Sequence, residues 1–286
     1  MLTTDNRFRI LQVADLHSDV EEALNERTRA DIRAMVGHCR PDLLVANGDI
    51  WCGDEHPDAA PMWMHRDIAF LGSLDTPWVF VWGNHDYCPG FDTARAIIAA
   101  APNAIAPRGD SRGAFRIEVK RRGVPEAVCW DLFFLNSGLS WRIPEDLLWF
   151  ESESARIAAE RGRIVPAAAF FHIPTKNYQD AMDAGRVTGI GVESVLGWGD
   201  DEGRAAPILK RPGNLRLCVC GHSHRNDYYF IEDGIRFVSG RATGHGGYGG
   251  EDLRKGATLI ELSLESDAVT TQTLFPDGSV WNYDAP

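Results

Sequence analysis

The sequence predicts an α/β (α+β) fold in which helices cover a sheet. Apolar runs of strand length alternate with helix-length segments through the first third of the chain, and a series of short strands closes it. Strands separated by helices are typical of βαβ units. With 286 residues and 44% hydrophobic content, the chain has enough apolar material for a deep core. No linker-like segment divides it, so we expect a single domain over residues 1–286.

The first third contains three predicted strands and two predicted helices. The strands are the apolar runs at 8–14, 42–47 and 78–82. The segments 19–37 and 61–74 carry apolar residues at helical spacing, and the first of them has a plausible stop at Gly37. This alternation indicates consecutive βα units.

The rest of the chain alternates less regularly. The helix expected over 144–161 opens with Pro144 and two acidic residues, which favour a first turn. The segment 174–213 is rich in Gly, Asp and Pro, and long segments of this kind are often functional loops. The expected strands lie near 114–119, 130–136, 167–171 and 215–220, followed by a closing β-meander of 228–231, 235–239, 257–264 and 269–274.

The formal net charge is −12, from 29 Lys+Arg and 41 Asp+Glu. A partner such as extended nucleic acid requires a basic surface, so this balance argues against it. A small phosphorylated substrate is compatible, because bound metal can reverse the sign of the charge inside one cleft. No run approaches the ~20 apolar residues that span a bilayer, and the start of the chain has no signal-peptide pattern. We therefore expect a cytoplasmic protein without a membrane partner.

Five short polar motifs each follow an apolar strand. They are Asp15-Leu-His17, Gly48-Asp49, Gly83-Asn-His-Asp86, His172 and Gly221-His-Ser-His224. Sites in α/β sheets form at the carboxyl ends of strands, where loops converge. Asp, His and Asn donors suit first-row metals such as Mn, Fe, Zn or Co. The motifs supply seven such donors, enough for two ions about 3.5–4 Å apart if one carboxylate bridges them.

The spacing within the motifs has a physical reason. Asp15 and His17 are two residues apart, so in an extended chain they leave on the same face. Glycines such as Gly48 and Gly83 permit a sharp turn and a close backbone approach. Taken singly, each motif is also compatible with a turn or a core histidine. Five of them at successive strand ends favour a metal site.

Two cysteines lie close to these motifs in the sequence. Cys52 and Cys88 follow the second and third motifs, so their loops are candidates for a disulfide or an accessory thiol. Reduced packing thiols are the alternative that a cytosolic protein favours.

In this order the five motifs resemble those of the calcineurin-like metallophosphoesterase superfamily, D-x-H, G-D, G-N-H-[D/E], H and G-H-x-H. The resemblance spans residues 15 to 224. Residues 8–17, 171–175 and 244–249 extend it to the branch of the yeast Dcr2-type and plant purple-acid-phosphatase-29-like proteins. The resemblance implies a four-layer αββα sandwich of mixed sheets flanked by helices, with two metal ions at its edge.

The same resemblance implies how the ligands divide between the two ions. The first ion would be held by Asp15, His17, Asp49 and His224. The second would be held by Asp49, Asn84, His172 and His222, so that Asp49 bridges. The iron-tyrosinate purple enzymes of the family have a Tyr shortly after the G-D motif and no His two residues after the first Asp. Residues 48–52 lack that Tyr and His17 is present, so we expect no purple chromophore.

The predicted catalytic residues are His85 and Asp86. His85 is adjacent to the predicted ligand Asn84, which we also expect to contact substrate. On the leaving-group side, a His85 cation would stabilise phosphoryl charge or donate a proton. Asp86 either holds the imidazole of His85 in one orientation or caps a turn, and both alternatives stay open.

The glycine-rich segment 244–250 is expected to be a flexible loop that drapes over the cleft. Arg241, His245 and Tyr248 would then contact the substrate phosphate or the leaving group. A turn-rich hairpin connection is the alternative.

The predicted function is hydrolysis of a phosphomonoester or phosphodiester by a dinuclear metal-dependent phosphoesterase, through direct attack of metal-bound hydroxide. One alternative is a non-catalytic metal-binding scaffold of the same fold. Another is a nuclease, which the acidic charge disfavours. The sequence leaves the natural substrate, the identity of the metals and the oligomeric state open.

Overall fold

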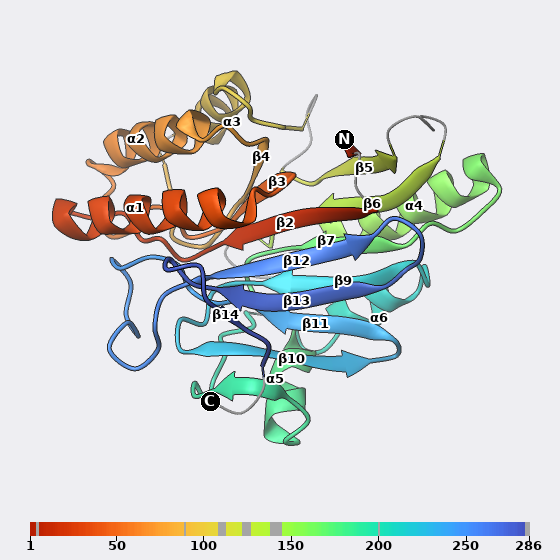
Figure 1. Cartoon of the computed structure of the whole chain (residues 1–286). Helices are drawn as coiled ribbons and strands as arrows, with labels where there is room; N and C mark the ends of the chain where they lie inside the picture. The colour runs from red at the N-terminus through yellow and green to blue at the C-terminus, as the bar shows by residue number, and fades with distance from the viewer. Residues whose placement is uncertain are drawn as a thin grey trace.

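A computed structural model of the chain describes residues 1–3, 6–88, 90–107, 113–121, 127–137, 145–199 and 201–283. Two mixed sheets pack against each other, and helices cover both outer faces (Figure 1). The four-layer αββα sandwich predicted from the sequence is therefore confirmed.

In the described part of the chain, six strands form the first sheet, in the order β14-β13-β12-β2-β3-β4. The strands are β2 (Arg7–Val13), β3 (Leu43–Asn47), β4 (Trp78–Val81), β12 (Ala257–Ser263), β13 (Val269–Leu274) and β14 (Val280–Trp281). Strands β2, β3 and β4 are parallel, because α1 (Glu22–Cys39) and α2 (Ala60–Ser73) return the chain between them. Helix α3 (Phe91–Ala100) follows β4.

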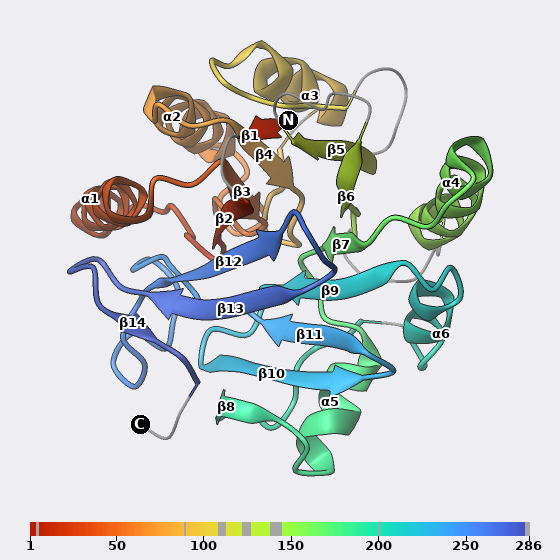
Figure 2. The same cartoon turned by 45° about the vertical axis from the view of Figure 1, so that its right-hand side comes forward.

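The second sheet has eight strands among the residues described, in the order β1-β5-β6-β7-β9-β11-β10-β8. Its strands are β1 (Leu2–Thr3), β5 (Phe115–Arg121), β6 (Val128–Phe134), β7 (Ala167–Phe170), β8 (Thr188–Gly191), β9 (Leu215–Cys220), β10 (Asn226–Glu232) and β11 (Ile235–Ser239). Strands β6, β7, β9 and β11 run parallel. Its outer face is covered by α4 (Glu145–Arg161), α5 (Lys176–Asp183) and α6 (Ala205–Lys210), on the opposite side of the molecule from α1–α3 (Figure 2).

Alternate residues of the strands supply separate cores. Ile10 of β2 and Val219 of β9 belong to the apolar cluster between the sheets. The neighbouring residue Leu11 belongs instead to the cluster shared with Ile32 of α1, under the helices. Because both faces of the sheet are buried, the central strands read as continuous apolar runs rather than as alternating ones.

The structure corrects several expectations about the elements. The expected closing meander is two separate hairpins, since β10 and β11 belong to the eight-stranded sheet while β12 and β13 belong to the six-stranded one. Helix α1 runs past Gly37, where a side chain would meet open space, and ends at a left-handed Arg40. The segment 174–213 is not a plain loop, because it contains α5, β8 and α6. Pro144 lies outside the described residues.

The helices of the described ranges were also compared with the length and hydropathy that a bilayer requires. None of them is both long and apolar enough to serve as a membrane span.

Candidate metal centre

The predicted ligands gather at one edge of the sandwich, where the carboxyl ends of five strands meet. Strands β2, β3 and β4 of one sheet and β7 and β9 of the other end at this edge. Each predicted ligand follows its strand within a few residues, which is where sites form in sheets of this kind.

The chain turns sharply at four of these positions. Asp15, His17, Asp49 and His222 have φ angles of 56°, 48°, 53° and 77°. Left-handed φ values are uncommon for residues other than glycine and concentrate at functional sites. The expectation that Asp15 and His17 leave an extended chain on one face is therefore corrected. The turn is held by backbone bonds, in which the Asp15 amide donates to the Gly48 carbonyl over 3.0 Å.

Two glycines make room for the ligands, as the motifs predicted. A Cβ on Gly48 would lie 2.4 Å from Nδ1 of His172. A Cβ on Gly83 would lie 2.2 Å from Oδ1 of Asp49. Real Cβ atoms do not approach so closely, so any side chain here would push a predicted ligand out of place.

Asp15, His17 and His224 form the first cluster of possible metal-binding atoms. The Nε2 atoms of His17 and His224 are 3.0 Å apart, and Oδ1 of Asp15 lies 3.4 Å from Nε2 of His224. All three side chains are buried. Their donor atoms surround one point, which a single cation can occupy.

Asp49, His172 and His222 form the second cluster. Oδ2 of Asp49 lies 2.9 Å from Nε2 of His172 and 3.7 Å from Nε2 of His17 in the first cluster. One carboxylate oxygen thus stands between imidazoles of both clusters, where a bridging ligand is required. The division into clusters is the one that the family resemblance implies for the two ions.

The hydrogen bonds of the histidines fit bound cations. Nδ1 of His172 donates to the carbonyl of Asn47 over 2.9 Å, and Nδ1 of His224 donates to the carbonyl of Tyr248 over 3.3 Å. A carbonyl can only accept, so Nδ1 carries a proton in both rings, and in the neutral ring each Nε2 can present a lone pair to a cation in its cluster. This arrangement of an outer acceptor and an inner lone pair is typical of metal-ligating histidines.

One predicted ligand also carries a buried polar atom without a hydrogen-bond partner. This atom is Oδ1 of Asn84, which belongs to the described ranges. Buried polar atoms are normally paired, so an unpaired amide oxygen is consistent with a cation that this oxygen would bind. The donor set of carboxylate, imidazole and amide oxygen suits Mn, Fe, Zn or Co.

Burial and neighbouring charge act differently on the imidazoles of His17, His222 and His172. Burial lowers the pKa of His17 to about 3 and that of His222 to about 4, so both are neutral at physiological pH. Burial also lowers the pKa of His172, but the carboxylates of Asp49 and Asp15 outweigh it and raise the pKa to about 10. The negative charge that attracts a proton to His172 would attract a metal cation equally.

His85 lies beside the clusters and is oriented by a residue that the sequence analysis did not select. Its Nδ1 is 2.7 Å from Oδ1 of Asp54. The His85 ring is half-buried and makes an edge contact with the ring of His17, at 5.0 Å between centroids. Its backbone amide donates to Oδ1 of the predicted bridging ligand Asp49 over 2.8 Å.

Asp86 is a backbone cap in this structure. Its buried carboxylate accepts from the amides of Asp49, Ile50, Trp51 and Gly83 over 2.7–3.3 Å. The structure thus corrects the alternative in which Asp86 orients His85. The carboxylate ties together the loops after β3 and β4, and Asp54 takes the position beside the imidazole.

A cavity of about 410 Å³ opens onto both clusters. Its walls include His85 and Tyr248, together with Val195 and Gly197 from the segment between β8 and α6. A Cβ on Gly197 would lie 2.8 Å from Nε2 of His222, so this segment packs directly on a predicted ligand. Sequence reasoning missed this contact, because the two residues meet only through the tertiary fold.

Of the three residues predicted in or near the glycine-rich segment, one lines this cavity. The ring of Tyr248 stacks on the ring of His224, at 4.0 Å between centroids. The expectations for Arg241 and His245 are corrected. Arg241 is buried and donates through Nε to Asp227 over 2.6 Å. Nε2 of His245 lies 2.8 Å from Oδ2 of Asp31 on α1, in a neighbouring groove.

The cysteines named beside the motifs are free thiols. Sγ of Cys52 lies 3.2 Å from Nδ1 of His17 and lines the cavity. Burial raises the pKa of this thiol, so the neutral form stands beside the predicted ligand. A disulfide between Cys52 and Cys88 is thus absent from the structure.

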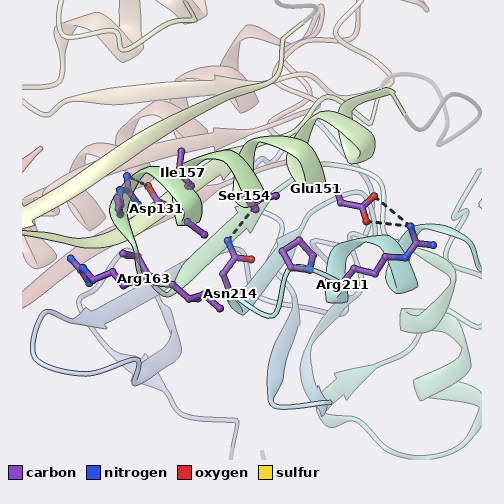
Figure 3. Close-up of a pocket in the computed structure, with 13 residues that line it drawn as sticks. Asp131, Glu151, Ser154, Ile157, Arg163, Arg211 and Asn214 are labelled. Carbon is purple, nitrogen blue, oxygen red and sulfur yellow. Dashed lines mark hydrogen bonds and ion pairs between the residues drawn. The ribbon is translucent and has the colours of Figure 1, made fainter.

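A separate cavity of about 220 Å³ lies along α4 (Figure 3). Its lining residues Val165 and Asn214 shortly precede β7 and β9, so it lies at the amino ends of these strands, whereas the clusters lie at their carboxyl ends. Its polar side chains largely bond each other, as Asn214 donates to Ser154 over 3.1 Å and Arg211 pairs with Glu151 over 3.3 Å. It contains neither cluster of possible metal ligands.

The chain is similar to known phosphatase-like proteins along most of its length. It is 26% identical over 315 residues to probable inactive purple acid phosphatase 28 of Arabidopsis thaliana, covering 91% of this chain and 76% of that protein. It is 25% identical over 315 residues to phosphatase DCR2 of Saccharomyces cerevisiae, covering 94% of this chain and 54% of that protein. These relatives confirm the branch that the motifs indicated.

Solved structures share the fold at low sequence identity. A dimetal phosphatase from Danio rerio has a TM-score of 0.57 and 14% identity, covering 94% of this chain and 93% of that one. GAP50, the anchor in the inner membrane complex of Plasmodium, has a TM-score of 0.59 and 14% identity, covering 98% of this chain and 90% of that one. The model of the calcineurin-like phosphoesterase family matches residues 8–226. The chain therefore belongs to the calcineurin-like phosphoesterase family.

Proposed function

We propose that this protein hydrolyses small phosphate esters with the help of two metal ions held by the two clusters. The observation that carries the proposal is the position of Asp49, whose Oδ2 lies 2.9 Å from His172 and 3.7 Å from His17. A shared carboxylate of this kind is what couples two ions into one reaction centre. Asp15, His17 and His224 would hold the first ion, and Asn84, His172 and His222 the second.

Two cations at these positions would supply Lewis-acid stabilisation of phosphoryl oxygens and would make a water molecule more acidic. The chain's own contribution is to fix the ligands before substrate arrives. The Asp86 carboxylate holds the loops that carry Asp49 and Asn84, through amides on both. Ligands that are already fixed do not have to reorganise during the reaction. This preorganisation is the main source of electrostatic catalysis.

His85 is the residue that we assign to the leaving group. It lines the cavity, its Nδ1 is held by Asp54, and Nε2 is the ring nitrogen that remains for substrate. Burial lowers the pKa of His85, but the carboxylates of Asp49 and Asp54 outweigh burial and raise it. The imidazolium form is thereby favoured, and it can stabilise phosphoryl charge or give a proton to the departing oxygen.

The charge of the cavity favours a substrate with one phosphate group. Carboxylates of Asp19, Glu55 and Glu193 line it, and no Lys or Arg is among its described lining residues. Positive charge would therefore come from the cations and His85 alone. A polyphosphate or an extended nucleic acid would bring further anionic groups against these carboxylates, so we propose small phosphorylated molecules as substrates.

The test is metal-dependent hydrolysis of two aryl esters. Protein stripped with a chelator is reloaded with Mn²⁺, Fe²⁺, Zn²⁺ or Co²⁺ in turn and assayed with p-nitrophenyl phosphate and bis(p-nitrophenyl) phosphate. We expect p-nitrophenol release that requires added metal and is lost in Asp49→Asn. The ratio of the two rates assigns the protein as a monoesterase or a diesterase.

A protein that binds two ions and hydrolyses neither ester would contradict the proposal. Such a result would favour the alternative of a non-catalytic metal-binding scaffold. The name of one relative, probable inactive purple acid phosphatase 28, is in line with that alternative. All seven predicted ligands and His85 are retained in this chain, and this supports an active enzyme.

A further inference from the structure

The glycine-rich segment packs against the chain that carries the first cluster, and Gly246, Gly247 and Tyr248 form part of the cavity wall. The amide of Gly244 donates to the carbonyl of Asp15 over 3.2 Å. A Cβ on Gly244 would lie 2.1 Å from the carbonyl oxygen of Leu16, and one on Gly247 would lie 2.5 Å from the ring of His224. The segment therefore touches both stretches of chain that supply the first cluster, and its glycines permit that approach.

Tyr248 connects this segment to the ligand His224 through two separate contacts. Its carbonyl is the acceptor for Nδ1 of His224 over 3.3 Å, and its ring stacks on the imidazole at an interplanar angle of 14°. Its hydroxyl donates to the carboxylate of Glu193 over 3.2 Å, so the side chain is also held at its far end.

The same carbonyl has a second donor, which is the ammonium group of Lys255. Nζ of Lys255 lies 2.9 Å from the Tyr248 carbonyl oxygen, and the residue is only 4% exposed. No carboxylate forms an ion pair with Lys255 within the described ranges, although Asp15 and Glu193 act on it at longer range, and burying a charged amine without a paired carboxylate is costly. A lysine in such a place needs a reason beyond packing.

We propose that Lys255 is a positioning residue for the first metal ion, acting through the Tyr248 carbonyl on the imidazole of His224. Two donors converge on one carbonyl oxygen and fix its direction. The fixed carbonyl then fixes the Nδ1 proton and the ring of His224, whose Nε2 faces Asp15 and His17. This inference rests on the proposed function, because it assumes that the first cluster binds a cation.

The arrangement predicts an effect on one ion more than on the other. His172 in the second cluster donates to the carbonyl of Asn47, the last residue of β3, which the sheet holds in place. The acceptor for His224 is instead a residue of an irregular segment, and Lys255 is its anchor. Loss of Lys255 should loosen the first cluster and leave the second intact.

The test is a Co²⁺ titration of chelator-stripped protein, followed by absorption spectroscopy and calorimetry. For wild type we expect two binding steps. For Lys255→Met, which keeps the apolar stem and removes the donor, we expect one step weakened about 10–100-fold and the other unchanged. Lys255→Arg retains a donor and should restore most of the lost affinity. Lys176→Met removes a partly exposed lysine paired with Asp180 and is the matched control, with both steps unchanged.

His224→Ala identifies which step belongs to the first cluster. Lys255→Met should weaken the same step, and the double variant should bind no more weakly than His224→Ala alone, since both act on one interaction. If Lys255→Met does not fold, Lys255→Gln takes its place with the same expected result.

The inference would be overturned if Lys255→Met bound Co²⁺ in two steps with wild-type affinities, or if the affinities of both steps fell equally. Because the readout is metal binding, the result separates this inference from the proposed function. A wild-type protein that binds two Co²⁺ ions but hydrolyses no phosphate ester would refute the proposed function while leaving the role of Lys255 supported.

Discussion

Asp54 and His85 are paired, with Oδ1 of the carboxylate 2.7 Å from Nδ1 of the imidazole. Asp54 follows β3 and His85 follows β4, so packing of adjacent strands brings them together. Neither residue belongs to the clusters of possible metal ligands. The pair therefore offers a way to separate an effect on catalysis from an effect on metal content.

His85→Ala should lower kcat for p-nitrophenyl phosphate by about 10²–10⁴-fold, the range that general acid–base groups contribute. The amide of residue 85 remains available to Asp49, so the metal content should stay at the wild-type value. Steady-state kinetics and elemental analysis of the same sample provide both measurements. An unchanged kcat with full metal content would remove His85 from the mechanism.

Asp54→Asn supplies a milder version of the same test. The amide keeps the size of the carboxylate but loses the charge that holds the imidazolium, so kcat should fall by about tenfold with metal content unchanged. Asp58→Asn, at an exposed carboxylate in the same loop, is the control and should leave kcat unaltered. Equal rates for the two variants would show that the contact with Asp54 does not matter.

The sequence was informative about the ligands because each of them lies near a strand end in the sequence itself. Asp49, for example, follows the apolar run at 42–47, and the edge it occupies follows from parallel strands. Asp86 shows the limit of such reasoning. An aspartate can either orient a histidine ring or accept hydrogen bonds from the backbone of a turn. Only the position of the loop after β3, whose amides donate to Asp86, shows which role it has.

The same limit applies to elements and contacts that depend on distant parts of the chain. Helices α5 and α6 have eight and six residues, too few for a clear helical period in a segment rich in Gly and Pro. Arginine is a residue type that often binds phosphate, but the guanidinium of Arg241 forms an ion pair with the buried carboxylate of Asp227 on β10. A sequence without coordinates does not reveal which arginine has a buried partner.

Asp86→Asn should destabilise the fold although the two side chains have the same shape. Each carboxylate oxygen of Asp86 accepts hydrogen bonds from two backbone amides. An NH₂ group in place of either oxygen cannot accept, so two buried amide donors would be left unsatisfied. We expect a loss of about 2–4 kcal/mol in the free energy of unfolding. Denaturant titration measures it, with Asp92→Asn as the control, because Asp92 is 95% exposed on α3. A variant as stable as the control would contradict the capping role.

Glu118 on β5 makes stability depend on acid pH. Burial raises the pKa of Glu118, but hydrogen bonds from Lys120, Arg161 and Arg116 outweigh burial and lower it to about 2. A carboxyl with a lowered pKa in the folded state contributes stability above its unfolded value, and this stability is lost as the pH falls toward the folded value.

For Glu118→Gln we therefore expect a loss of about 1–2 kcal/mol at pH 7, after allowance for solvent screening of a side chain that is partly exposed. The difference from wild type should shrink between pH 4.5 and about 2. Thermal unfolding across this range measures it. Glu265→Gln, which removes a largely exposed partner of Arg121, is the control and should show little change at any pH. A difference that is constant with pH would mean that Glu118 contributes through packing alone.

Asp49→Ala tests the bridging position most directly. Oδ2 of Asp49 stands between His172 and His17, so removal of the carboxylate takes an anionic ligand from both clusters at once. We expect both ions to be lost on dialysis, whereas His222→Ala should release mainly the ion of its own cluster. The comparison is made by elemental analysis after both variants have been checked for folding by circular dichroism. Two tightly bound ions in Asp49→Ala would show that each cluster is complete without the shared carboxylate, and a mechanism that depends on paired cations would then lose its structural basis.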